Sequence, residues 1–172
     1  MRSRTKKKSV SLIAVRLLLF IYILILVRLI VFKYPIPILR GIMDNWDVDM
    51  VRRGVYSANL RPFKTVRMYV RYFHQINGFD NLFGNIFAFL PFGMLLPLAF
   101  EDCSNVGYVL LHSFWLSLGI EIFQLISHFG EFDVDDIILN CLGALLGYIC
   151  YRIGQFLLYG SAKTRKAVSS QK

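Results

Sequence analysis

Four long apolar stretches constrain this chain more than any other feature of its sequence. They cover residues 11–32, 82–100, 106–127 and 137–159, and each is close to the roughly 20 residues that a helix needs to cross a bilayer. Hydrophobic residues make up 56% of the 172 residues and charged residues only 18%, which is more apolar surface than one soluble core can bury. The sequence therefore predicts an all-α integral membrane protein, a four-helix transmembrane bundle that forms a single domain over residues 1–172.

The basic residues gather beside the apolar stretches. Five of the first eight residues are basic, and three more lie within residues 163–166. Basic tails next to membrane spans favour the cytoplasmic side, so both termini are expected in the cytoplasm. Against this orientation, the connection over residues 33–80 carries eight Lys and Arg residues. Anionic lipid headgroups account for the net charge of +9, and no nucleic-acid partner is expected.

Residues 63–75 of that connection show a helical period. Phe63, Val66 and Val70 fall on one face, and basic residues fall on another. A basic amphipathic segment of this kind is typical of a helix that lies in the membrane interface. It either serves as a simple anchor or binds the phosphate of a lipid or lipid-linked substrate with its basic row. The expected phosphate contacts are Arg61, Lys64, Arg67 and Arg71.

Polar residues recur at helical spacing near one end of the second, third and fourth stretches. Because polar stripes that face lipid are costly, these stripes are expected to face one another. Gly143 and Gly147 form a G-x-x-x-G pattern in the fourth stretch, which allows a neighbouring helix to approach closely. The predicted polar intramembrane pocket comprises Asn81, Asn85, Ser117, Glu121, Gln124, Asp133, Asp136 and Asn140.

Glu121 and the acidic run before the fourth stretch each have two interpretations. An ionised carboxylate in hydrocarbon costs about 3 kcal/mol or more, so Glu121 is either a protonated structural residue or a catalytic acid or base. The acidic run at 131–136 contains Asp133, Asp135 and Asp136. These aspartates either cap the fourth helix or supply oxygen ligands to Mg²⁺ or Ca²⁺. The capping interpretation explains the spacing of the run, so no metal and no other cofactor is expected.

Four short blocks resemble the VanZ-like family of membrane proteins. They are N-L-R-P-F-K-T at 59–65, N-L-F-G-N-I-F-A-F-L-P-F-G at 81–93, S-x-x-x-E-x-x-Q at 117–124, and F-D-V-D-D-I-I-L-N at 132–140 with glycines at 143 and 147. The resemblance implies a multi-pass protein of the bacterial cell membrane. It also implies a link to teicoplanin-type glycopeptides, because some members reduce susceptibility to these antibiotics.

Two functions are compatible with these features. The first is to lower susceptibility to teicoplanin-type glycopeptides by binding or altering lipid-linked envelope components, with membrane lipids and a lipid-linked cell-wall precursor or glycopeptide as partners. The second is that of an intramembrane metal-assisted enzyme acting on a lipid or polyprenyl phosphate. The sequence contains no H-E-x-x-H, no G-x-S-x-G and no glycine-rich phosphate loop. The non-enzymatic function is therefore favoured, and the enzymatic one stays open.

Overall fold

All regular secondary structure in the described part of the chain is helical. The computed structural model describes residues 2–72, 78–100, 102 and 104–169, and it describes the side chains of residues 12–72, 82–100, 102 and 104–158. The helices are α1 (Arg2–Val31), α2 (Ile36–Asp44), α3 (Val48–Ser57), α4 (Lys64–Arg71), α5 (Gly78–Ala99), α6 (Val106–Ser127) and α7 (Val134–Ser169).

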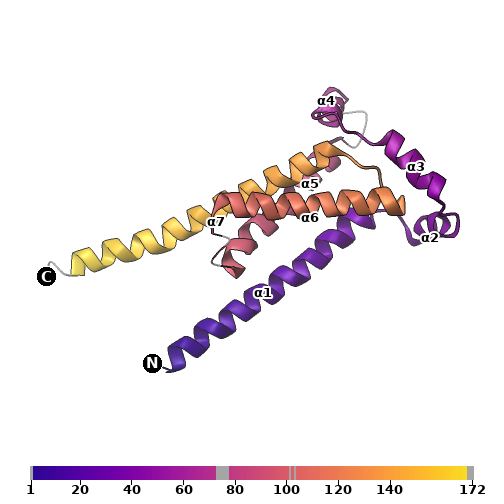
Figure 1. Cartoon of the computed structure of the whole chain (residues 1–172). Coiled ribbons are helices and arrows are strands. Elements are labelled where there is room, and N and C mark those ends of the chain that lie inside the picture. The colour runs from indigo at the N-terminus through magenta and orange to yellow at the C-terminus, as the bar shows by residue number, and fades with distance from the viewer. Residues whose placement is uncertain (1, 73–77, 101, 103, 170–172) are drawn as a thin grey trace.

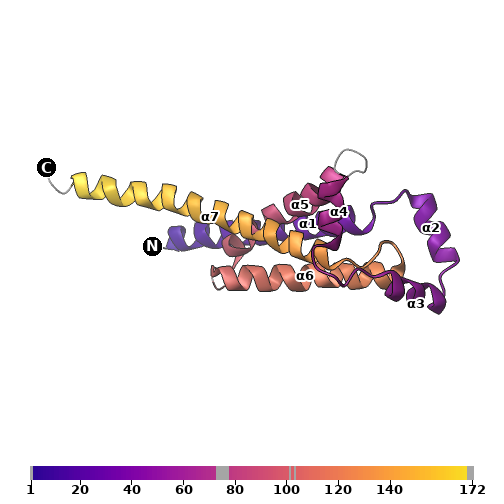
Figure 2. The ribbon, with the colours of Figure 1, turned by 90° about the horizontal axis from the view of Figure 1, so that it is seen from above.

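Four of these helices are long and apolar enough to cross a membrane, which confirms the predicted fold class. The spans are Leu12–Val31, Leu82–Ala99, Val106–Ser127 and Val134–Leu158. The helices run alongside one another, and both termini lie at one end (Figures 1 and 2). The short helices α2, α3 and α4 lie at the opposite end, which we call the short-helix end. Which end faces the cytoplasm stays a prediction.

The short-helix end contains one helix that the sequence predicts and two that it does not. Helix α4 falls within the expected segment 63–75, of which residues 73–75 lie outside the described part. Helix α2 follows Pro35, which occupies its N-cap position, with a second proline in the first turn. Proline is tolerated there because the first N–H groups of a helix have no partner within the helix. Helix α3 begins after Asp47, whose carboxylate accepts the Met50 N–H at 2.5 Å.

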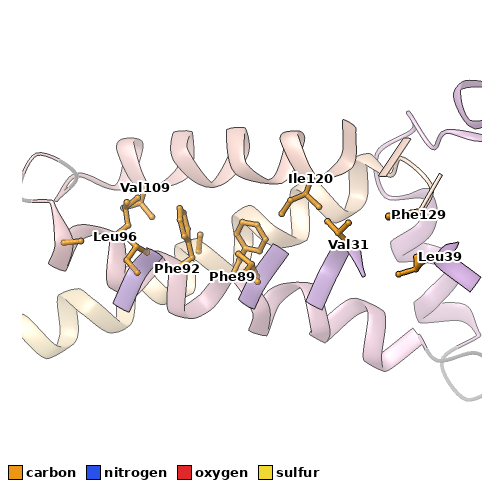
Figure 3. Close-up of a cluster of buried hydrophobic side chains, with 12 residues drawn as sticks. Val31, Leu39, Phe89, Phe92, Leu96, Val109, Ile120 and Phe129 are labelled. Carbon is orange, nitrogen blue, oxygen red and sulfur yellow. The ribbon is translucent and has the colours of Figure 1, made fainter. Parts of the chain in front are cut away.

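The core of the bundle is built around α5. Phe89, Phe92 and Leu96 of α5 are buried between α1 and α6, where they form one cluster with Val109 and Ile120 (Figure 3). Such burial of aromatic and aliphatic side chains gives close packing without any polar group to satisfy.

Glycines bring α5 and α7 into backbone contact. A Cβ added to Gly147 would lie 1.9 Å from the Leu90 carbonyl oxygen, and one added to Gly93 would lie 1.9 Å from that of Ala144. Gly143 is equally confined, with 2.2 Å to the Ile86 carbonyl oxygen. We call Gly93, Gly143 and Gly147 the glycine seam. Its two members on α7 are the predicted G-x-x-x-G pair.

Candidate functional site

The buried Asp135 at the start of α7 caps a different helix, α4. Its side chain is 0% exposed, and its carboxylate accepts the backbone N–H groups of Phe63 at 2.5 Å, Thr65 at 2.7 Å and Val66 at 3.1 Å. These are N-terminal N–H groups of α4, which have no partner within their own helix. Asp135 therefore fixes the position of α4 against the start of α7.

Asp133 strengthens the same connection. Its Oδ1 accepts the Asp135 N–H at 2.8 Å, the cap that the sequence suggests for α7. The same oxygen accepts the Asn59 side-chain N–H at 2.8 Å, and Oδ2 accepts the Thr65 hydroxyl at 2.5 Å. Asn59 and Asp133 also form an isolated parallel β-bridge. We call Asp133 and Asp135 the carboxylate clamp.

The clamp favours capping over metal binding as the role of the acidic run. The carboxylates of Asp133 and Asp135 are occupied by N–H and O–H donors. Within the ranges that the structure describes, no three His, Cys, Asp or Glu side chains gather so as to hold a metal ion. The geometry therefore gives no support to the Mg²⁺ or Ca²⁺ interpretation.

Glu121 connects the membrane-spanning part of α6 to this clamp. It is 0% exposed, and its Oε2 accepts the Asp133 N–H at 2.9 Å. One turn away, the Asn140 side-chain N–H donates to the Ser117 hydroxyl at 2.8 Å. Glu121 Oε1 and Asn140 Oδ1 are buried and have no hydrogen-bond partner among the described residues. A buried acceptor without a donor is costly. These two oxygens, at the contact between α6 and α7, can each accept a further hydrogen bond. A catalytic role for Glu121 stays a prediction.

A polar cavity of about 320 Å³ opens between α1, α5, α6 and α7. Its polar residues come from α5, α6, α7 and the segment directly after α1, and its apolar residues come from α1 and α5. Gln124 donates its amide N–H to the Ile30 carbonyl at 3.1 Å, and the Asn85 side chain lies beside the Asp136 carboxyl. The cavity is lined by Leu29, Ile30, Lys33, Gly84, Asn85, Ala88, Gln124 and Asp136.

The predicted pocket is therefore divided into three parts. Asn85, Gln124 and Asp136 line the polar cavity; Ser117, Glu121 and Asn140 lie in the adjacent contact of α6 with α7; and Asp133 belongs to the clamp. The side chain of Asn81 lies outside the described part of the chain. Lys33 is not among the predicted pocket residues, although a cation directly after the apolar stretch 11–32 is a usable signal for the mouth of such a cavity.

Three of the four basic residues predicted to bind phosphate share one groove on α4. Lys64, Arg67 and Arg71 line a groove of about 500 Å³ with Met68 and Tyr72, which we call the basic groove. Arg61 is exposed but does not line it. The ion pairs found among the described residues lie elsewhere, joining Arg52 to Asp49 and Arg53 to Asp47.

The other side of α4 faces the acidic run. Burial, together with the negative charges of Asp136 and Asp133, raises the pKa of Tyr69 above its ordinary value. Tyr69 therefore stays neutral while Lys64, Arg67 and Arg71 remain accessible. Helix α4 thus presents its charges away from the bundle.

Comparison with known proteins places this architecture in a family. The family model described as VanZ/LLP1 matches residues 19–157. Protein VanZ of Enterococcus faecium is 33% identical over 97 residues, which are 55% of this chain and 52% of that protein. The chain thus spans about half the length of this curated relative, and no solved structure matches it significantly. Because the family model covers most of the chain, the protein belongs to the VanZ/LLP1 family.

Proposed function

We propose that this chain is a multi-pass protein of the bacterial cell membrane that lowers susceptibility to teicoplanin-type glycopeptides. It does so by binding an anionic, lipid-linked envelope component in the basic groove of α4. The observation that carries the proposal is the convergence of Lys64, Arg67 and Arg71 on one exposed groove at the end of a membrane bundle. Cytoplasmic termini, which are part of the proposal, put this groove on the outer surface of the membrane.

The chemistry of the groove suits a phosphate group. Arginine donates paired N–H groups to phosphate oxygens, and lysine adds a compact charge. No ion pair among the described residues uses these three cations, so their charge is available to a ligand. A volume of about 500 Å³ is within the usual range for small-molecule sites.

The carboxylate clamp supports the proposal by preparing the groove in advance. Asp135 holds three N–H groups at the start of α4, and Asp133 holds the Thr65 side chain. A helix that is already fixed loses little conformational freedom when a ligand binds. The lipid tail of the ligand remains in the surrounding bilayer, so only its head has to enter the groove.

The test is the teicoplanin susceptibility of a sensitive Gram-positive host, with membrane levels of each variant matched. The groove variant carries Lys64→Gln, Arg67→Gln and Arg71→Gln. Its control carries Arg40→Gln, Arg52→Gln and Arg53→Gln, which remove the same number of charges from exposed sites on α2 and α3. We expect wild type and control to protect the host and the groove variant to fail.

Binding of polyprenyl phosphate vesicles to the purified protein gives an independent readout. Each charge-assisted hydrogen bond contributes about 1.5–3 kcal/mol, so the groove variant should bind about tenfold more weakly or worse. Equal binding by wild type and groove variant would exclude this groove as the site. Failure of wild type to protect the host would remove the resistance function itself. A product released from the lipid, and abolished by a chelator, would favour the enzymatic alternative.

A further inference from the structure

The polar cavity lies near the ends of the four candidate membrane spans. Asp136 and Gln124 are two and three residues inside the ends of their spans, Asn85 is three residues inside its span, and Lys33 lies two residues beyond Val31. At about 1.5 Å per residue, all four lie within roughly 5 Å of the hydrocarbon edge. A lipid can bring its headgroup to this cavity by lateral diffusion.

The floor of the cavity offers mainly hydrogen-bond acceptors. Asp136 contributes a carboxylate and Asn85 contributes an amide beside it, while the amide N–H of Gln124 is donated to the Ile30 carbonyl. Both amides retain their carbonyl oxygens. One anionic and two neutral oxygens form a set that suits a primary ammonium, which has three N–H groups to donate.

The mouth of the cavity has the opposite charge. Lys33 is exposed and lies close enough to act electrostatically on Asp136, but no ion pair among the described residues joins the two side chains. A cation at the mouth and an anion at the floor complement a ligand that carries a phosphate and an ammonium a few bonds apart. The volume of about 320 Å³ is at the small end of ligand sites, which fits a headgroup.

We infer that this cavity binds a phosphoethanolamine-type zwitterion, with its ammonium at Asp136, Asn85 and Gln124 and its phosphate at Lys33. The source that its depth favours is a phospholipid with an ethanolamine headgroup. Phosphatidylcholine is a close negative control, because its trimethylated nitrogen has the same charge but no N–H to donate. Phosphatidylglycerol lacks the ammonium altogether. The site is separate from the basic groove and does not rest on the proposed function.

The experiment is native mass spectrometry of the full-length protein, loaded with equal amounts of phosphatidylethanolamine, phosphatidylcholine and phosphatidylglycerol. Wild type should retain phosphatidylethanolamine about fivefold better than phosphatidylcholine, as expected for lost N–H bonds. Asp136→Asn and Gly84→Leu should each abolish this preference. A Cβ at Gly84 meets nothing within 4 Å, so a leucine there fills the open cavity. Gly154→Leu, at an equally open position on α7, should keep it.

Competition by soluble headgroups and a folding control complete the experiment. Soluble phosphoethanolamine should displace the bound lipid, and phosphocholine should not. Equal retention of the three lipids by wild type, or an unchanged preference in a folded Gly84→Leu protein, would overturn the proposal. The thermal unfolding of Gly84→Leu and Gly154→Leu establishes that both are folded. The triple variant of the basic groove should keep the lipid preference, so failure of the proposed function would leave this result intact.

Discussion

The glycine seam and the carboxylate clamp hold two parts of the same bundle together by opposite means. The seam brings α5 and α7 together by omitting side chains, so that backbone touches backbone deep in the apolar region. The clamp joins α4 to α7 with two carboxylates that accept N–H and O–H groups at the short-helix end. In the apolar region, where no water can solvate polar groups, close packing of the two backbones holds the helices together. At the membrane edge, a charge can be buried because enough donors surround it.

Replacing a seam glycine is expected to have the largest effect. In Gly147→Val, the new Cβ would lie 1.9 Å from the Leu90 carbonyl oxygen and 3.0 Å from the Met94 nitrogen. Neither backbone atom can move without displacing its helix, so the unfolding free energy should fall by about 3 kcal/mol or more. Denaturation in mixed micelles measures this loss. Gly154→Val, on the same helix with open space around it, should stay within about 1 kcal/mol of wild type. Equal losses in both variants would contradict the role of the seam.

Breaking the clamp should have a smaller and more local effect. Asp135→Asn removes the charge and replaces one accepting oxygen with a donor, so the N–H groups of Thr65 and Val66 lose their partner. We expect a loss of about 2–3 kcal/mol, concentrated in α4. Hydrogen exchange of residues 63–66 should accelerate while α6 keeps its protection. Asp49→Asn, on the exposed side of α3, is the control, and unchanged exchange at 63–66 in Asp135→Asn would refute the cap.

Changing Glu121 should have the smallest effect on stability when its shape is kept. Glu121→Gln retains an oxygen for the Asp133 N–H and nearly the same side-chain shape, so it should remain within about 1 kcal/mol of wild type. Glu121→Leu leaves the Asp133 N–H without a partner and should lose about 2 kcal/mol. Chemical denaturation separates the two variants. If Glu121→Gln is stable but no longer protects against teicoplanin, the carboxyl group has a role beyond the fold.

The long helices could be predicted because length and apolarity alone define a membrane span. The third stretch was predicted at 106–127 and is observed as Val106–Ser127. The fourth begins at Val134 rather than 137, because the helix starts directly after the Asp133 cap and includes two aspartates that look polar in sequence. Helices α2 and α3 were missed because they are short and only amphipathic, so neither reaches the length of a span.

Helical spacing predicts which residues of the candidate site share one face of a helix, but not which residues from distant segments meet. Spacing correctly put Ser117 and Glu121 on one stripe of α6, and the structure places both against the start of α7. The clamp could not be predicted in the same way, because Asp135 and Phe63 are separated by 72 positions. No local pattern at Asn59 or Thr65 indicates that these residues meet an aspartate from the last helix.

The same separation has a consequence for how the protein is made. Residues 59–66 leave the ribosome roughly 70 residues before the aspartates that hold them, which is on the order of 10 seconds at typical rates of synthesis. Throughout that interval α4 has no cap, and its start has N–H groups without partners. The short-helix end is therefore completed only when α7 enters the membrane, so the last helix to be inserted closes a structure begun near the first.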